Sequence, residues 1–254
     1  MTPLVEETRE GVIVVLTMNA PERRNALSMA MRAEFTTILA RLEGDASVRA
    51  IVLTGAGGQF CSGGDIAGMN VDEFGDGRER FRLSHRMVRL MIESSKPFVA
   101  AVEGWAAGAG VGLAICCDTV VAGAGAKFLT PFGRIGLIPD FALLHTLPRR
   151  IGEGRARQML LAGEPVDAMT AERYGLVDHV VPDGTALDKA RERAQRLAEA
   201  APLANAMTKA ILARGLADSL EWERTVQATL FMTADHAEGK AAFKAKRPPV
   251  FKGV

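Results

Sequence analysis

Short apolar runs alternate with helical patterns over most of the chain, and this alternation limits the folds that the chain can adopt. Residues 11–18 (GVIVVLTM) and 50–54 (AIVLT) have the composition of buried strands, and apolar residues between Met31 and Leu42 recur at helical spacing. A second helical pattern, over residues 81–91, leads into a further strand-like run, 98–102 (FVAAV). The recurring order of strand, helix and strand predicts a mixed α/β body.

The last part of the chain predicts helices alone. From Ala186 onward the helical patterns follow one another without an intervening strand-like run, and Asp218 and Asp235 each precede a glutamate by three residues, as in capping boxes. Earlier in the chain, Ser28 is a candidate N-cap for the helix that follows it. We therefore expect an α/β body over residues 1–195 and a helical region over residues 196–254.

Composition narrows the class of protein. The chain has 254 residues, of which 48% are hydrophobic, enough for a large core in one domain or in a domain with a helical appendage. Its 31 basic and 30 acidic residues give a net charge of +1, which argues against a dedicated nucleic-acid binder. Basic runs such as 23–24 and 244–247 are short, so we expect no nucleic-acid partner.

The chain shows no membrane segment and no metal motif. The longest uncharged stretch made only of apolar residues and glycine, 104–117, is shorter than the roughly 20 residues that cross a bilayer. The N-terminus carries acids and lacks the basic start of a signal peptide, so we expect a cytoplasmic protein without a membrane partner. The three cysteines and four histidines show neither disulfide nor metal-ligand spacing, and we expect no metal and no cofactor.

Two glycine-rich passages, 55–66 and 104–118, each follow a strand-like run. Neither contains G-x-G-x-x-G in register, and the chain has no Walker lysine, no G-x-S-x-G and no H-E-x-x-H. Glycines at a strand end can bring backbone N–H groups to a ligand oxygen, as in an oxyanion hole. Composition alone favours the alternative, close helix packing through Gly108, Gly110 and Gly112.

Asp140 is a single acid within the apolar stretch 132–150 (FGRIGLIPDFALLHTLPRR). It either caps a helix at the surface or is held partly dry, where a carboxyl group can perform acid/base chemistry. Desolvation would raise the pKa of this carboxyl, whereas a helix N-terminus would lower it, and the sequence leaves the balance open.

Several segments resemble, in order along almost the whole chain, those of the crotonase (enoyl-CoA hydratase/isomerase) superfamily. They are PERRNALSMAM, FCSGGDI, EGWAAGAGVGLAICCD, GLIPD, RRIGEGRARQMLLAGEPVDAMTAERYGLVDHVV and AAFKAKRPPVF. The resemblance implies a spiral of strand-strand-helix units, followed by a helical region that builds homotrimers, often paired into hexamers. It also implies an acyl-CoA thioester substrate, whose carbonyl oxygen accepts hydrogen bonds from the N–H groups of Gly64 and Ala109. Alanine at 109 is tolerable there if its φ is negative.

The departures from the family pattern point to one branch of its chemistry. The hydratases of this family carry two glutamates at positions that are Gly112 and Phe132 here. The segment GLIPD resembles that of the members that isomerise the ring 1,2-epoxide of phenylacetyl-CoA, in which the aspartate moves the proton. The resemblance therefore implies an acyl-CoA isomerase with Asp140 as acid/base. Hydration or other thioester chemistry, and a non-catalytic acyl-CoA-binding paralogue, stay as alternatives.

The resemblance also assigns substrate-binding residues. The loop positions that match the family's CoA site are Arg24, Ala26, Ser62 and Ile66. The aromatic residues next to the acyl group are Phe132 and Phe141, and the residues of the last helix that reach a neighbouring subunit's CoA are Phe243 and Lys246. Isolated basic residues are more often solvated surface, which is the alternative for Arg24 and Lys246. His145 and Cys61 are interpreted as structural.

Overall fold

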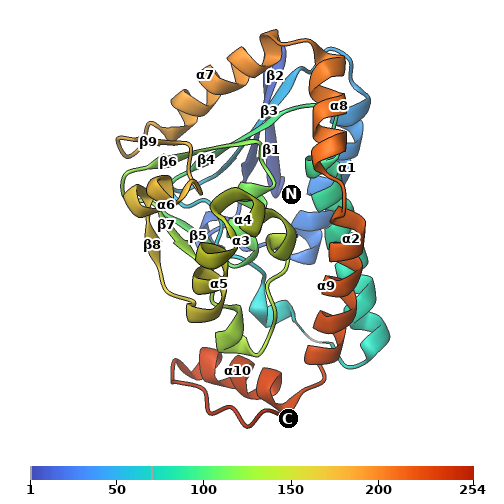
Figure 1. Ribbon diagram of the computed structural model, residues 1–254, viewed down its shortest axis with the longest axis vertical. Helices are drawn as coiled ribbons and strands as arrows, with labels where there is room; N and C mark the ends of the chain where they lie inside the picture. Colours follow the sequence, from blue (N-terminus) through green and yellow to red (C-terminus); the bar gives the residue numbers. More distant parts are fainter. Residues whose placement is uncertain (1, 70) are drawn as a thin grey trace.

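The computed structural model describes residues 2–69 and 71–254, and its centre is a six-stranded mixed sheet (Figure 1). The strand order is β1-β2-β3-β4-β6-β9, in which only the first pair is antiparallel. The strands are β1 (Val5–Glu10), β2 (Ile13–Met18), β3 (Ala50–Gly55), β4 (Phe98–Val102), β6 (Thr119–Gly123) and β9 (His179–Val181).

A smaller sheet extends the spiral toward the glycine-rich loops. It contains β5 (Trp105–Ala107), β7 (Lys127–Leu129) and β8 (Val166–Asp167), with β7 in the middle. Two isolated parallel bridges, Cys61 with Ala106 and Leu27 with Gly64, continue this layer. The backbone segments around residues 27, 61–64 and 106 are therefore held side by side.

Helices cover both faces of the six-stranded sheet. On one face α7 (Ala186–Glu199) packs its alanines, spaced four residues apart, on the strands. Small side chains at this spacing let the helix approach the sheet closely, and the buried residues of this layer include Ile13, Val15, Val52, Val99, Ala190 and Ala194. The predicted boundary between residues 195 and 196 falls inside α7, and the division into two domains stays a prediction.

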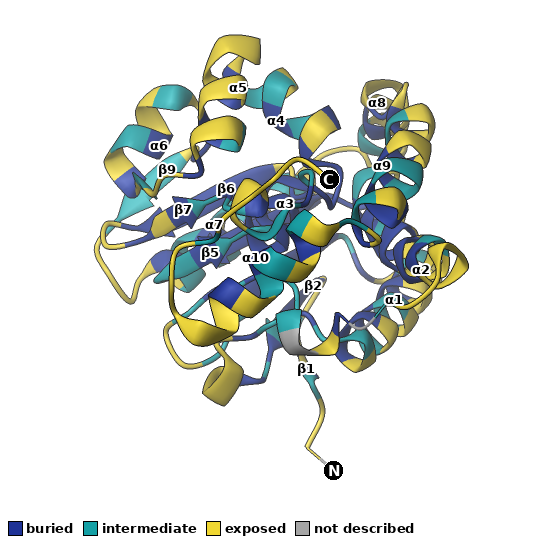
Figure 2. Cartoon of the chain, turned by 90° about the horizontal axis from the view of Figure 1, so that it is seen from below, coloured by how far each residue is buried: buried dark blue, intermediate teal, exposed yellow. Residues whose placement is uncertain are grey.

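The opposite face carries the main core, whose buried strands and inner helix faces are seen in Figure 2. Beside it lie α1 (Met29–Gly44), α2 (Phe74–Ile92), α8 (Pro202–Leu212) and α9 (Leu216–Leu230), with α9 packed along α2 (Figure 1). The other helices are α3 (Ala109–Ile115), α4 (Leu143–Ile151), α5 (Glu153–Ala162), α6 (Ala168–Tyr174) and α10 (Ala234–Ala245), with short turns η1 (Pro21–Arg23), η2 (Ile66–Gly68) and η3 (Phe132–Ile135). Helix α10 packs on η3.

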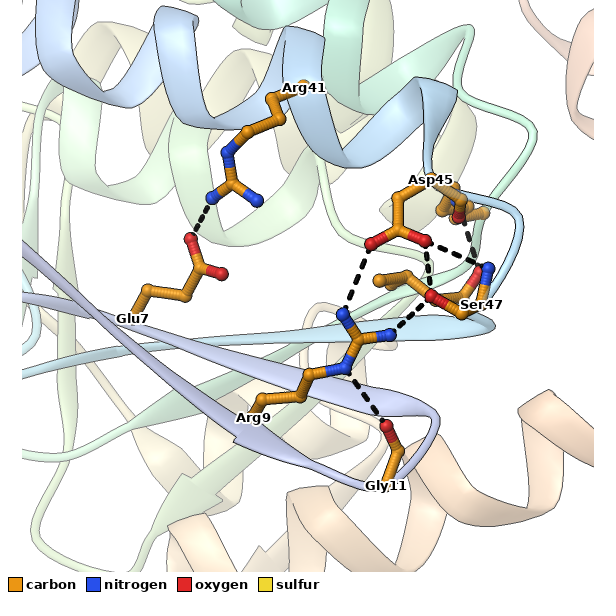
Figure 3. Close-up of polar contacts among 8 residues, drawn as sticks. Glu7, Arg9, Gly11, Arg41, Asp45 and Ser47 are labelled. Carbon is orange, nitrogen blue, oxygen red and sulfur yellow. Dashed lines mark hydrogen bonds and ion pairs between the residues drawn. The ribbon is translucent and has the colours of Figure 1, made fainter.

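Polar contacts fasten the β1–β2 hairpin to α1, as Figure 3 shows. Arg9 of β1 binds Asp45 at the end of α1 (3.1 Å) and donates to the hydroxyl of Ser47, while Glu7 pairs with Arg41. These side chains are partly exposed to solvent, so each pair contributes at most about 1 kcal/mol, and they orient an edge strand that has little apolar surface of its own.

The helix starts test the predicted caps. Ser28 caps α1 as predicted, since its hydroxyl accepts a hydrogen bond from the N–H of Met31. The two predicted capping boxes are wrong. Asp218 lies within the first turn of α9, which begins after Gly215, and the hydroxyl of Thr233, rather than Asp235, caps α10. In the described part of the chain, no helix combines the length and the apolar character that a membrane crossing requires.

Candidate active site

Asp140 lies on the loop between η3 and α4 and is 5% exposed. Its carboxyl does not cap α4, which begins at Leu143, and its Oδ1 has no hydrogen-bond partner among the described residues. Burial, and then the negative charge of Glu223, raise the pKa of Asp140 to about 7, against the opposing effect of Arg32 and Arg80. Of the two environments considered for this acid, the dry one is observed.

Glu223 of α9 holds the backbone directly after Asp140. The N–H groups of Phe141 and Ala142 donate to its two carboxylate oxygens at 3.0 Å each, and Nε2 of His85 lies 2.7 Å from Oε1. Phe141 and Ala142 both have positive φ, 55° and 58°, a conformation that costs non-glycine residues energy and persists only where the surroundings impose it. The buried carboxylate of Glu223 thus fixes the loop that presents Asp140.

Phe141 occupies the space in which a side chain at position 112 would lie. A Cβ added to Gly112 would come within 2.6 Å of Cβ of Phe141 and 3.0 Å of its carbonyl oxygen. Phe141 itself is fully buried, and its ring lies against the guanidinium of Arg32, 5.0 Å from the ring centre. The aromatic side chain and the glycine on α3 are therefore complementary, and a longer residue at 112 does not fit beside this loop.

The two glycine-rich loops bring their backbone N–H groups to the same region. Gly64 is held by the bridge to Leu27, and Ala109 is the first residue of α3, with the negative φ that alanine favours. A Cβ added to Gly63, which precedes Gly64, would come within 2.7 Å of the carbonyl oxygen of Ala107 and 3.6 Å of the backbone nitrogen of Ala109. Among the described residues, neither Gly64 nor Ala109 donates its N–H to a protein acceptor, so both N–H groups are available to a ligand.

The charges of two buried arginines act on Asp140 and lower its pKa. Arg32 of α1 is 2% exposed and donates to the carbonyl oxygen of Leu27 (3.1 Å) and to the hydroxyl of Ser84. Arg80 of α2 is 9% exposed and donates to the carbonyl oxygen of Gly68 (3.2 Å). Neither guanidinium pairs with a carboxylate among the residues that the structure describes.

The predicted CoA-binding loops are adjacent. The N–H of Ser62 donates to the carbonyl oxygen of Arg24 (2.9 Å), and Ala26 follows after the turn formed by Arg24 and Asn25. Arg23 forms an ion pair with Asp65 (2.8 Å), so this acid holds the loop and does not cap η2, which begins at Ile66. The side chain of Arg24 is exposed, whereas Arg23 is engaged in holding the two loops together.

Comparison with known proteins places this arrangement in a family. The model of the family described as enoyl-CoA hydratase/isomerase matches residues 7–254. The chain belongs to the enoyl-CoA hydratase/isomerase family. It is 37% identical to a 1,2-epoxyphenylacetyl-CoA isomerase of Escherichia coli, with 96% of each chain covered, and 40% identical to a probable enoyl-CoA hydratase of Rhodobacter capsulatus, with 97% of this chain and 96% of the relative covered.

Solved structures of this enoyl-CoA hydratase/isomerase family have the same fold. A crystal structure of an enoyl-CoA hydratase from Mycobacterium avium subsp. paratuberculosis superposes with a TM-score of 0.88 at 30% identity, over 98% of both chains. The predicted crotonase-type α/β fold is therefore confirmed. The relatives are named both isomerases and hydratases, so family membership alone leaves the type of reaction open.

Of the remaining predicted substrate-binding residues, one is buried near the site and two are exposed. Phe132 is buried, and its ring lies 3.8 Å from the position that a Cβ at Gly108 would take, next to the loop of Ala109. Phe243 and Lys246 lie at the end of α10 and are exposed, and no described hydrogen bond or ion pair joins either side chain to the other predicted residues. Their predicted contact with a neighbouring subunit's CoA stays a prediction.

Cysteine and histidine side chains contribute to packing near the site. Burial raises the pKa of the Cys61 thiol to about 12, which makes it a poor nucleophile at neutral pH. His145 is buried on α4, and burial lowers its pKa. No group of three or more His, Cys, Asp or Glu side chains within residues 2–69 and 71–254 is arranged to hold a metal ion.

Sequence reasoning did not identify Glu223, His85, Arg32 or Arg80. Glu223 and His85 lie on α9 and α2, 83 residues after and 55 residues before Asp140, as the residue numbers show, and only the packing of α9 on α2 joins them. A signal was nevertheless present, because each of the four charged or polar residues occupies an inward position of an amphipathic helix.

Proposed function

We propose that this chain is an acyl-CoA isomerase in which Asp140 moves one proton. The ionised carboxyl removes a proton from Cα of the thioester, and the electron pair of that C–H bond passes to the carbonyl oxygen, giving an enolate. Asp140 then returns the proton to Cγ, and the electron pair of the enolate re-forms the thioester carbonyl as the double bond moves. The substrate is an unsaturated or ring-derived acyl-CoA, and one carboxyl group is sufficient for both steps.

The backbone N–H groups of Gly64 and Ala109 stabilise the enolate in this proposal. Both lack a described protein acceptor, and their loops are fixed by the bridge to Leu27 and by the start of α3. A donor aimed at the oxygen of such an intermediate contributes roughly 3 to 4 kcal/mol to transition-state stabilisation. The reaction requires neither a metal ion nor a further cofactor.

The observation that carries the proposal is the contact between Phe141 and Gly112. Hydration adds a water molecule across two adjacent carbons and benefits from two carboxyl groups, one of which would come from position 112 by the family resemblance. Phe141 fills that space, whereas Asp140 is buried with a pKa of about 7, near the pH at which an acid/base exchanges protons most effectively. The site therefore favours a reaction with a single proton carrier.

The substrate's CoA portion is proposed to bind at Arg24, Ala26, Ser62 and Ile66, and its acyl group to lie against Phe132 and Phe141. Apolar side chains of α8 support self-association into a trimer or hexamer, since Leu203, Met207 and Ile211 are 76%, 61% and 64% exposed. Phe243 and Lys246 are proposed to reach the CoA of a neighbouring subunit in this assembly. We further propose that the enzyme acts in the cytoplasm.

A second candidate function is hydration or other thioester chemistry, with Asp140 acting on a positioned water. The names of several relatives support it, including a short-chain-enoyl-CoA hydratase of Clostridium acetobutylicum that is 32% identical. A product heavier by one water, or release of free CoA, distinguishes this chemistry from isomerisation. Tight CoA binding without turnover of any thioester would indicate a binding paralogue.

The test is proton exchange in deuterated water. Wild type, Asp140→Asn and the surface control Asp188→Asn are incubated with 2-enoyl, 3-enoyl and arylacetyl CoA thioesters, and the products are followed by mass spectrometry. We expect deuterium uptake or double-bond migration in wild type and control, and a loss of at least about 100-fold in Asp140→Asn. Equal rates in wild type and Asp140→Asn would refute the role of Asp140.

A further inference from the structure

We infer that Arg80, supported by Arg32, binds an oxygen atom carried by the acyl group of the substrate, so that the enzyme selects oxygen-bearing acyl-CoA thioesters over plain hydrocarbon ones. This inference rests on the proposed function, because it assigns the acyl group to the space beside Asp140. The relevant chemistry is a hydrogen-bond-accepting oxygen, either in a carboxylate or in a neutral carbonyl or hydroxyl group.

Arg80 has an unused donor in a buried position. One nitrogen of its guanidinium, Nη1, donates to the carbonyl oxygen of Gly68, whereas Nη2 is buried and has no partner among the described residues. A guanidinium carries five N–H donors in a planar arrangement, and a buried donor without an acceptor destabilises the protein. A ligand oxygen that accepts from Nη2 would remove this cost.

Arg32 is fixed beside the proposed oxyanion hole. Its side chain is held by the carbonyl oxygen of Leu27, the hydroxyl of Ser84 and the ring of Phe141. The two guanidinium groups repel each other, and the charge of Arg80 lowers the pKa of Arg32. Its Nη2 lies 3.4 Å from the position that a Cβ on Gly64 would take. The positive charge of Arg32 is therefore next to the loop that presents the Gly64 N–H.

The acids near this pair are committed elsewhere or are only partly charged. Asp65 is paired with Arg23, and the carboxylate of Glu223 receives three hydrogen bonds from Phe141, Ala142 and His85. The charges of both arginines lower the pKa of Asp140, although it forms no ion pair with either among the described residues, and its Oδ1 also lacks a described partner. Two buried cations thus act on one acid that, in the proposed mechanism, alternates between neutral and charged forms.

These observations are better explained by recognition than by stability. Isolated buried cations destabilise a fold unless they are paired, and an apolar acyl chain beside Nη2 of Arg80 would leave the cation unpaired in the complex as well. A carboxylate would accept a charge-assisted hydrogen bond, and a neutral oxygen would accept a weaker one. Both kinds of oxygen distinguish the substrate from a hydrocarbon chain of the same length.

The experiment compares three thioesters of equal acyl length that end in a methyl group, a neutral keto or hydroxyl group, or a carboxylate. Dissociation constants are measured by calorimetry on Asp140→Asn protein, which holds the substrate without proton transfer, with and without Arg80→Gln. Arg80→Lys serves as a second variant that keeps the charge, and Arg82→Gln, on the exposed face of the same helix, as the matched control.

We expect Arg80→Gln to weaken binding of an oxygenated thioester by about 10- to 100-fold and binding of the methyl-terminated one by less than about threefold. A loss confined to the carboxylate, largely restored by Arg80→Lys, identifies an anionic group, and a loss confined to the keto or hydroxyl compound identifies a neutral one. Equal changes for all three thioesters in Arg80→Gln would overturn the inference, and so would equal changes in Arg80→Lys if the glutamine variant does not fold.

The outcome is separable from that of the proposed function. Oxygen-selective binding without deuterium exchange by the wild-type enzyme would contradict the isomerase proposal and leave the recognition by Arg80 supported. Deuterium exchange that depends on Asp140, with no selectivity lost in Arg80→Gln, would do the reverse.

Discussion

Replacing Asp140 by asparagine should stabilise the folded protein at neutral pH while it removes proton transfer. The pKa of this carboxyl is about 7 in the fold, against an ordinary value of 3.8, so the folded state holds the proton more tightly than the unfolded state. The contribution of Asp140 to the unfolding free energy is therefore highest at low pH and is lost as the pH rises from about 4 to 7. Asparagine keeps the shape of the neutral carboxyl and does not ionise.

The magnitude follows from the two pKa values. They differ by about 3, and each pKa unit corresponds to about 1.4 kcal/mol, so Asp140→Asn should gain up to about 4 kcal/mol in unfolding free energy at pH 8. The gain should fall to about 2 kcal/mol at pH 5.5 and to about 0.5 kcal/mol at pH 4, and vanish near pH 3. Chemical denaturation of both proteins at several pH values and one fixed protein concentration measures this difference.

A surface acid provides the control for this measurement. Asp188, whose side chain is 79% exposed, should change stability by less than about 0.5 kcal/mol when replaced by asparagine, at every pH. The reasoning is refuted if Asp140→Asn is less stable than wild type at pH 8, or if its gain does not depend on pH. Either result would mean that the charged form of Asp140 is as well accommodated as the neutral one.

Two other predictions concern the loop around Asp140. Glu223→Gln leaves one backbone N–H of the loop opposite an amide donor, so we expect a loss of about 1 to 3 kcal/mol in unfolding free energy. The same substitution removes a charge that raises the pKa of Asp140, so the pH profile of deuterium exchange should move to lower pH. An unchanged profile would contradict the electrostatic role of Glu223. Gly112→Ala places a Cβ 2.6 Å from Cβ of Phe141. Although alanine favours a helix, we expect a net loss of about 1 to 3 kcal/mol in unfolding free energy, measured by thermal or chemical denaturation. A stabilised variant would show that Phe141 does not fill this space.

The sequence predicts the elements whose apolar periodicity is strong. Strands β2, β3 and β4 and helix α1 appear where their patterns indicated them, because each has an apolar face that the core must bury. Strand β1 was not predicted, since its residues (VEETRE) are mostly exposed and its strand conformation comes from pairing with β2. An edge strand with a solvated face has little pattern of its own.

The candidate site was predictable only where local motifs carry it. Asp140 was singled out because it is an acid in an apolar stretch, and Gly64 and Ala109 were assigned because their segments resemble those of the crotonase superfamily. The environment of Asp140 depends on Glu223, Arg32 and Arg80, which come from three other helices. Whether its pKa is raised or lowered was open for that reason, since burial and long-range charges decide it and neither is a property of residues 132–150.

The contact of Glu223 with the Asp140 loop changes the interpretation of the helical region. That region was expected to build the assembly, yet one of its helices, α9, supplies the carboxylate that holds Phe141 and Ala142 in their left-handed conformation. A displacement of α9 along α2 would remove both hydrogen bonds and release the strained backbone next to the proposed acid/base. Helix α9 therefore belongs to the architecture of the site, because its Glu223 holds the backbone after Asp140 and, next to burial, raises the pKa of that carboxyl.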